Sequence, residues 1–211
     1  MLITAHGGAH GTGRNSKLYF SRIPEYECDV LEVDVRKRKG KLYISHLPAL
    51  FPGRHLSLEY AFEKVKEYNL FINCDMKERG LTKDVLELAE KMGITDKIFF
   101  TGWVIGVEEA KALPGGKVFF NKIPGIPFKE GNAEKIKQVL GDNPRLAGIN
   151  AGKLLVNEKF LEECVKAGVA VSLYTLNSQA DAEKYSKLNL FNLTCNNPAA
   201  VRKLIKGKEV Q

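Results

Sequence analysis

Residues 30–35 read Val30-Leu31-Glu32-Val33-Asp34-Val35, and this alternation of apolar and acidic side chains decides the interpretation of the chain. With the two-residue period of a β-strand, the apolar side chains share one face, and Glu32 and Asp34 share the other. The two acidic residues lie about 6.6 Å apart along the strand, so both carboxylates can reach one cation. Taken alone, an acidic strand of this kind is more often a solvated sheet edge than a metal site.

Further polar residues stand at the ends of neighbouring predicted strands. Residues 2–6 end at His6, directly before Gly7-Gly8, a pair that ends a strand and allows close approach of the backbone. Residues 70–76 deliver Asp75 and then Lys77, and His46 follows a strand at 41–44. His46 alone is compatible with a loop histidine, and Asp75 with a turn or a helix N-cap. Because acids inside apolar strands are costly to bury without a partner, their recurrence predicts one shared pocket.

Strand-like and helix-like segments alternate along the whole chain. Strands are expected at 2–6, 30–35, 70–76, 97–100, 118–120, 146–149, 169–174 and 190–193. Helices are expected at 58–68, 82–92, 107–112, 133–140, 158–167, 179–188 and from Pro198 onward. Eight such units favour an α/β fold that closes into a compact (β/α)8 TIM barrel, with 41–44 adding a short hairpin after the second strand. We therefore expect a single barrel domain over 1–211, with its active site at the carboxyl ends of the strands.

Composition agrees with a cytoplasmic enzyme. The chain has 211 residues, 44% of them hydrophobic, and no run of roughly 18 apolar residues predicts a transmembrane segment. The first residues enter a strand without the charged and apolar regions of a signal peptide. The four cysteines are widely scattered and form no Cys-x-x-Cys pair, which argues against a zinc ribbon or a disulfide framework.

The net charge of +7 raises the question of a nucleic-acid partner. The densest basic run, Arg36-Lys37-Arg38-Lys39, lies where a hairpin turn would carry it into solvent. No aromatic-interleaved basic platform accompanies it, so we expect no nucleic-acid binding. The positive field would instead help to gather an anionic phosphodiester or attract the chain to an acidic lipid surface.

Short motifs occur in a fixed order along the chain. They are His6-Gly7-Gly8, Arg14-Asn15-Ser16, Glu32-Val33-Asp34, Gly40 with His46-Leu47, Asp75-Met76-Lys77, Tyr174-Thr175-Leu176-Asn177 and Thr194-Cys195-Asn196-Asn197-Pro198. In order and spacing they resemble the motifs of the glycerophosphodiester phosphodiesterase family, in the phosphatidylinositol-phosphodiesterase-like TIM barrel superfamily. The resemblance runs nearly end to end, and its most specific part is the early histidine, the Glu-x-Asp strand and the second histidine.

Four positions depart from the family pattern. Gly7 stands where the family has an arginine, Arg14 where it has a glutamate, and Leu47 where it has an aspartate. Asp75 replaces a glutamate and in this resembles the sphingomyelinase D branch of the superfamily. The departures leave the reaction type better defined than the substrate.

The resemblance implies roles for the polar residues. Glu32, Asp34 and Asp75 are expected to bind one divalent cation, Mg²⁺ or Ca²⁺, while His6 and His46 act as general acid and base, in either order. Expected substrate contacts come from Lys77 at the phosphate and from Arg14, Asn15, Asn177 and Trp103. Asn121 and Asn150 also follow apolar strands and are weaker candidates for the pocket.

Three functions follow as alternatives. The first is hydrolysis of glycerophosphodiesters to an alcohol and sn-glycerol 3-phosphate, as part of lipid or glycerol metabolism. The expected partner is a small-molecule phosphodiester or a lysophospholipid. The second is a lyase-type cleavage of a phospholipid head group that leaves a cyclic phosphate. The third is a barrel that binds a phosphate ligand without turnover. The sequence leaves the oligomeric state, the metal and the head-group preference open.

Overall fold

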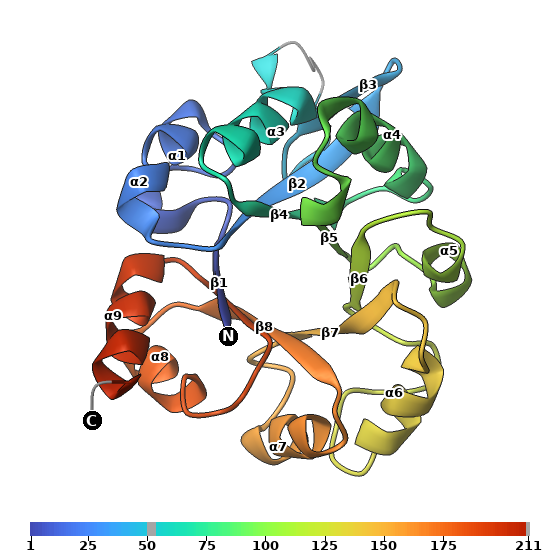
Figure 1. Cartoon of the computed structure of the whole chain (residues 1–211), viewed down its shortest axis with the longest axis vertical. Coiled ribbons are helices and arrows are strands. Elements are labelled where there is room, and N and C mark those ends of the chain that lie inside the picture. Colours follow the sequence, from blue (N-terminus) through green and yellow to red (C-terminus); the bar gives the residue numbers. More distant parts are fainter. Residues whose placement is uncertain (50–53, 210–211) are drawn as a thin grey trace.

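Eight parallel strands close into a barrel in the computed structural model, which describes residues 1–49 and 54–209 (Figure 1). The strands of the ring are β1 (Leu2–Ala5), β2 (Val30–Arg38), β4 (Phe71–Met76), β5 (Ile98–Thr101), β6 (Lys117–Phe120), β7 (Leu146–Gly152), β8 (Ala170–Leu176) and β9 (Asn192–Cys195). Strand β1 closes the ring, because Ala5 pairs with Cys195 of β9 on one side and with Leu31 of β2 on the other. The predicted TIM barrel is confirmed.

One strand lies outside the ring. Strand β3 (Lys41–Ile44) pairs antiparallel with the end of β2, as the expected hairpin requires. The hairpin turns at Lys39 and Gly40, both with positive φ. The basic run is only partly free in solution, since Arg36 forms an ion pair with Glu78 and Lys37 with Asp84.

Helices surround the ring of strands (Figure 1). They are α3 (Leu58–Glu67), α4 (Thr82–Met92), α5 (Val107–Lys111), α6 (Ala133–Leu140), α7 (Glu158–Lys166), α8 (Gln179–Tyr185) and α9 (Pro198–Glu209), close to the predicted ranges. Side-chain caps define several starts: the Ser57 hydroxyl accepts a hydrogen bond from Tyr60 N at α3, and Ser178 forms a capping box with Asp181 at α8. Among the described helices, none is long and apolar enough to cross a membrane.

Two features differ from the sequence prediction. The segment between β1 and β2 forms a 3₁₀ turn (Ala9–Gly11) and two short helices, α1 (Lys17–Ser21) and α2 (Ile23–Tyr26), each too short to show a helical hydrophobic period. The last strand begins at Asn192 instead of 190, because its residues through Cys195 pair in register with β1. That pairing is set by a strand at the other end of the chain.

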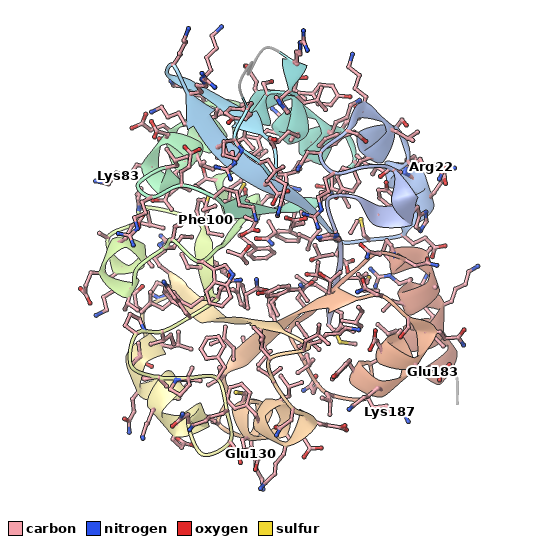
Figure 2. All side chains as sticks on the ribbon, turned by 180° about the vertical axis from the view of Figure 1, so that it is seen from behind. Arg22, Lys83, Phe100, Glu130, Glu183 and Lys187 are labelled. Carbon is pink, nitrogen blue, oxygen red and sulfur yellow. The ribbon has the colours of Figure 1, made fainter. Side chains whose placement is uncertain are left out.

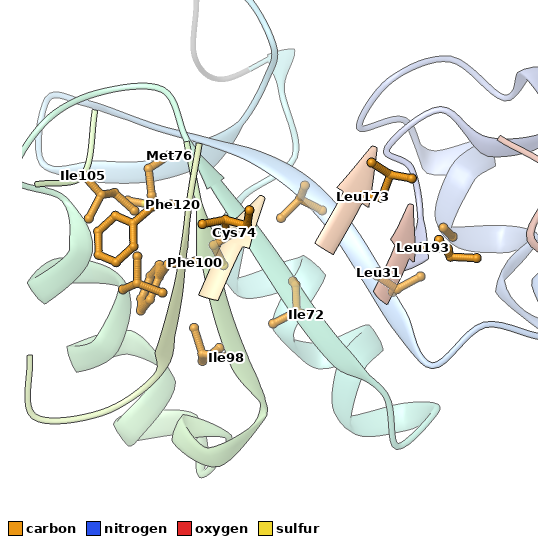
Figure 3. Packing of buried hydrophobic residues seen from close by; sticks show 14 of the residues in the cluster. Leu31, Ile72, Cys74, Met76, Ile98, Phe100, Ile105, Phe120, Leu173 and Leu193 are labelled. Carbon is orange, nitrogen blue, oxygen red and sulfur yellow. The ribbon is translucent and has the colours of Figure 1, made fainter. Parts of the chain in front are cut away.

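The main hydrophobic core fills the layer between the strands and the helices. Figure 3 shows part of it, with Leu31, Ile72 and Phe100 directed away from the barrel axis toward the helices. In residues 30–35, the apolar residues that alternate with Glu32 and Asp34 lie on this outward face of the strand. Charged side chains occupy the opposite side of the helical layer, where Figure 2 shows Arg22, Lys83 and Glu130 projecting outward.

The inside of the barrel is layered. At the amino ends of the strands, Val30, Phe99 and Phe119 form a second apolar cluster, with Phe119 stacked on Phe191 at 4.8 Å between ring centroids. Above it lies a buried polar layer, in which Thr4 Oγ1 donates to Asn192 Oδ1 at 2.7 Å. The floor of the barrel is therefore filled, and space for a ligand remains at the carboxyl ends of the strands.

Candidate active site

A cavity of about 350 Å³ opens at the carboxyl ends of the strands. It is lined by His6, Arg14, Glu32, Asp34, His46, Asn73, Asp75, Lys77, Thr101, Trp103, Asn121, Asn150, Tyr174, Thr175 and Thr194. The residues that the sequence nominated for a site thus meet in one place, except that Asn15 and Asn177 lie outside the lining.

Three carboxylates share one wall of the cavity. Glu32 and Asp34 project from β2 and Asp75 from β4, where Asp34 and Asp75 stand directly opposite in the register. One oxygen from each lies within 4.8 Å of the others. Oxygens on opposite sides of a Ca²⁺ ion lie about 5 Å apart and those around Mg²⁺ about 4.2 Å apart, so the three groups fit one hard divalent cation.

The electrostatics of this cluster call for a cation. Burial raises the pKa of Glu32 well above its usual range, and the Asp34 and Asp75 carboxylates raise it further. Burial also raises the pKa of Asp75. Asp34 behaves differently: burial works against its ionisation, but Lys77, Asn15 and His46 together hold its pKa below the usual value. Three close carboxylates therefore ionise fully only when positive charge is near.

Lys77 supplies such a charge. Its Nζ lies 2.8 Å from Asp34 Oδ1 and also forms an ion pair with Asp75. Burial would lower the pKa of Lys77, yet the two aspartates raise it, so the side chain is a permanent ammonium. A second cation at the cluster would share these aspartates with Lys77.

His46 contacts the acidic wall from the loop after β3. Its Nδ1 lies 3.2 Å from Asp34 Oδ1, and 44% of its side chain is exposed at the mouth. A carboxylate can only accept a hydrogen bond, so Nδ1 is the donor and Nε2 is left for a ligand. Leu47, which stands where the resembled family has an aspartate, is 69% exposed.

His6 enters from β1 and is held by two asparagines. Asn196 Nδ2 donates to Asn177 Oδ1 at 2.6 Å, which turns Asn196 Oδ1 toward His6 Nδ1 at 2.9 Å. His6 Nδ1 must then carry the hydrogen, and Nε2 keeps its lone pair. Burial lowers the pKa of His6, the Asn196 hydrogen bond offsets part of this, and the Arg14 guanidinium lowers it further. Asn177 acts on the site through this chain of hydrogen bonds.

Asn15 also positions a site residue from outside the lining. Its Nδ2 donates to Asp34 Oδ2 at 2.8 Å, and its Oδ1 accepts from Asp34 N at 3.1 Å. Asn15 has a φ of 54°, a left-handed conformation that asparagine tolerates better than most residues. The side chain is thereby fixed against β2.

Gly7 explains one departure from the family pattern. Its N–H donates to Glu32 Oε2 at 2.6 Å, and a Cβ at this position would lie 2.9 Å from the same oxygen. A larger residue would therefore displace the carboxylate or the backbone. The close contact between backbone and carboxylate depends on glycine here.

The cavity lining also contains residues that the sequence analysis did not nominate as site residues. Asn73, Thr101, Tyr174, Thr175 and Thr194 line the cavity, and Asn121, a weaker candidate, joins them by donating from Nδ2 to Tyr174 OH at 3.1 Å. The available signal was the two-residue spacing of polar side chains, as in Asn73 with Asp75 and Asn192 with Thr194.

Comparison with known proteins relates the fold of this chain to solved structures. The sequence matches no protein-family model and no curated protein. The fold, in contrast, is shared with a glycerophosphodiester phosphodiesterase from Parabacteroides distasonis, with 13% identity, a TM-score of 0.75 and coverage of 99% of this chain and 98% of the other.

Two more structures are similar over nearly their full lengths. An Oleispira antarctica phosphodiesterase, solved in complex with the product sn-glycerol-3-phosphate, has 16% identity and a TM-score of 0.76, and the match covers 98% of this chain and 97% of that one. A glycerophosphodiester phosphodiesterase from Thermotoga maritima has 18% identity and a TM-score of 0.68, with 100% and 98% covered. The resemblance indicated by the sequence motifs is thus confirmed in three dimensions: the chain has the fold of the glycerophosphodiester phosphodiesterases.

Proposed function

We propose that this protein is a metal-dependent phosphodiesterase that hydrolyses glycerophosphodiesters to an alcohol and sn-glycerol 3-phosphate. The observation that carries the proposal is the meeting of two histidines and three carboxylates in one cavity at the carboxyl ends of the strands. The fold shared with glycerophosphodiester phosphodiesterases supports the same reaction class.

Glu32, Asp34 and Asp75 would hold the cation, either Mg²⁺ or Ca²⁺. Both are hard ions that take carboxylate oxygens. The separation of up to 4.8 Å matches the span across Ca²⁺, and Mg²⁺ would draw the oxygens closer together, to about 4.2 Å. When bound, the ion neutralises charge on the phosphate and polarises its oxygens. Lys77 and Arg14 add positive charge at the same cavity, where a phosphate dianion forms as the product.

The surroundings of the histidines favour different roles. Neutral His6 presents the lone pair of Nε2 and is suited to take the proton from the attacking water. His46, when doubly protonated, donates from Nδ1 to Asp34 and from Nε2 to the leaving oxygen. Water adds to phosphorus as the ester P–O bond breaks, and the departing alkoxide receives its proton from His46.

Asn15 and Asn177, predicted as substrate contacts, are better assigned to positioning. Asn15 fixes the Asp34 carboxylate, and Asn177 fixes the tautomer of His6 through Asn196. Trp103 lines the cavity and keeps its proposed role as a contact to the substrate. The cytoplasm remains the proposed location, which fractionation of cells expressing the tagged chain would test.

A lyase reaction is the second candidate. If a hydroxyl of the substrate attacks phosphorus in place of water, the same two histidines yield a cyclic phosphate and release the alcohol. The short Asp75 side chain, where the resembled family has a glutamate, is the feature that favours this version. A barrel that binds phosphate ligands without turnover is the third alternative.

Phosphorus NMR distinguishes these functions. The purified protein is incubated with glycerophosphocholine, glycerophosphoethanolamine or a lysophospholipid, each with Mg²⁺, Ca²⁺ or excess EDTA. Metal-dependent appearance of sn-glycerol 3-phosphate from the first two supports the hydrolase, and a persistent cyclic phosphate signal would assign the lyase. Unchanged spectra under every condition, from protein that still binds the metal, would contradict both.

A further inference from the structure

A second hollow adjoins the catalytic cavity. It has a volume of about 500 Å³, and Trp103, Asn121 and Tyr174 line both spaces. The rest of its wall comes from the loops after β6 and β7, with the apolar side chains of Ile123, Ile126, Pro127, Phe128, Leu155 and Val156. We call this space the apolar groove.

The two spaces divide the mouth of the barrel by chemistry. The acids, His6 and Lys77 come from β1, β2, β4 and the residues just after them. The apolar groove lies over the ends of β5 to β8, and among its described lining residues Lys122 is the only one with a formal charge. A ligand that extends from one space into the other must be charged at one end and apolar at the other.

The wall of the apolar groove is anchored to the fold. Ile123 and Ile126 form a β-bridge, with Ile126 N donating to Ile123 O at 3.1 Å. Phe128 stacks on Phe160 of α7 at 6.3 Å between ring centroids. On the other side, Leu155 N donates to Gly152 O at 2.8 Å at the end of β7. The groove is therefore formed by structured loops.

Large apolar side chains at the rim are left in water. Trp103 is 51% exposed and Leu155 is 68% exposed. Covering such surface with an apolar ligand is favourable, and the groove's volume lies within the range of small-molecule sites, about 300 to 1,000 Å³. Because the apolar groove is continuous with a cavity suited to phosphate, a ligand with an apolar end in the groove would have a phosphate at its other end.

We infer that the apolar groove binds the single alkyl or acyl chain of a lysophospholipid-type phosphodiester whose phosphate lies at the acidic cluster and Lys77. The inference rests on the proposed function and extends its substrates to glycerophosphodiesters that carry one chain, from which the same hydrolysis releases the head-group alcohol and a single-chain glycerol 3-phosphate. The alkyl or acyl chain of the ligand runs past Trp103 into the apolar groove, between the loops after β6 and β7. The head group of the ligand extends out of the catalytic cavity on its open side.

Trp103 provides a direct measurement of this binding, because it is the only tryptophan in the chain. Its fluorescence is titrated with alkylphosphocholines of four, six and eight carbons, below their micellar concentrations and with saturating Ca²⁺. We expect a blue shift and an affinity that rises at least about tenfold from the four-carbon to the eight-carbon chain. Leu155→Asn should abolish most of that rise.

Leu154→Asn is the matched control. Leu154 is 89% exposed beside Leu155 but does not line the groove, so its replacement should leave the chain-length dependence intact. Equal affinity for all chain lengths would overturn the inference. An equal loss in both variants would also overturn it and would assign the leucines to contact with a lipid surface.

Turnover separates this inference from the proposed function. Comparable kcat/KM for glycerophosphocholine and for its one-chain octyl ether would leave the phosphodiesterase intact and refute the single-chain substrate class. Chain-dependent binding at Trp103 without cleavage of any phosphodiester would support the groove and refute the catalytic proposal.

Discussion

At the scale of single residues, the two candidate catalytic histidines differ in their partners. His6 faces the amide oxygen of Asn196, and His46 faces the carboxylate of Asp34. An amide oxygen that accepts from Nδ1 leaves the lone pair of the neutral ring at Nε2, while a carboxylate adds a negative charge that attracts an imidazolium. The proposed roles of His6 as base and His46 as acid rest on these partners.

Each histidine is expected to be essential for turnover. His6→Ala and His46→Ala should each lower kcat by about 100- to 10,000-fold, because each removes one proton-transfer group. Calcium affinity measured by calorimetry should stay close to that of the wild type, since neither residue is among the three carboxylates.

His55→Ala serves as the control for the histidine variants. His55 is exposed, contacts the Tyr43 ring and does not line the cavity, so its replacement should leave kcat unchanged. Wild-type turnover in either of the other two variants would refute the acid and base assignment.

The pH dependence of kcat/KM reports on the proposed base. Burial lowers the pKa of His6 below its usual value of 6.5, so the reactive neutral form persists as the pH falls through 6.5 and is lost only below it. We expect the acid limb to lie below pH 6.5. Arg14→Met removes a charge that lowers this pKa and should move the limb upward. A limb unmoved in that variant would assign it to another group.

At the scale of elements, β2 contributes one face to the hydrophobic core and the other face to the candidate site. Its outward residues Leu31, Val33 and Val35 are fully buried in the core, and its inward residues Glu32 and Asp34 line the cavity. Parallel pairing with β4 then sets Asp75 opposite Asp34. The acidic cluster proposed to bind the metal is therefore a consequence of strand register.

Asp34→Asn tests the metal site on β2. The substitution keeps the shape of the side chain but removes a charge that a divalent cation needs, so Mg²⁺ and Ca²⁺ affinity should fall at least about tenfold in calorimetry. Asp96→Asn, at an exposed acid on the 3₁₀ turn before β5, should bind as the wild type does. Unchanged affinity in Asp34→Asn would contradict the carboxylate cluster.

Helix α3 illustrates an element whose start is set by a single side chain. The Ser57 hydroxyl accepts the hydrogen bond of Tyr60 N at 3.1 Å. Ser57→Ala should cost about 1 kcal/mol in the free energy of unfolding, measured by urea denaturation, with kcat unchanged. A change in kcat with no change in stability would mean that the loop before α3 contributes to the site.

At the scale of the whole molecule, burial of the acidic cluster lowers the stability of the metal-free protein. The raised pKa of Glu32 means that the native state holds a proton more firmly than the unfolded chain does. Metal-free stability therefore falls as the pH rises above the usual pKa of glutamate, because the unfolded chain then releases this proton while buried Glu32 retains it. A cation that binds the carboxylates of the native state would offset this loss of stability.

Glu32→Gln should stabilise the metal-free protein. In EDTA at pH 8 we expect a gain of about 1 kcal/mol, or a Tm higher by about 2 to 4 °C, and a smaller gain at pH 5. Added Ca²⁺ should raise the Tm of the wild type and have little effect on the variant. A lower Tm for the variant in EDTA would show that the ionised carboxylate stabilises the fold.

Local patterns in the sequence were sufficient for the barrel and for most of the candidate site. The alternation in residues 30–35 places both acids on one face whatever the strand pairs with, and the repeating strand and helix periods predict the closed ring. Since the carboxyl ends of parallel strands meet at one end of a barrel, residues 40 or more positions apart were assigned to one cavity.

Tertiary structure alone decided the rest. The register of β9 depends on β1, the helical segments α1 and α2 are too short for a periodic signal, and the roles of Asn15 and Asn177 follow from partners far along the chain. The apolar groove likewise arises where loops after β5, β6 and β7 meet. Periodicity reports which way a side chain points relative to its own strand or helix, and only the packed molecule determines what it then contacts.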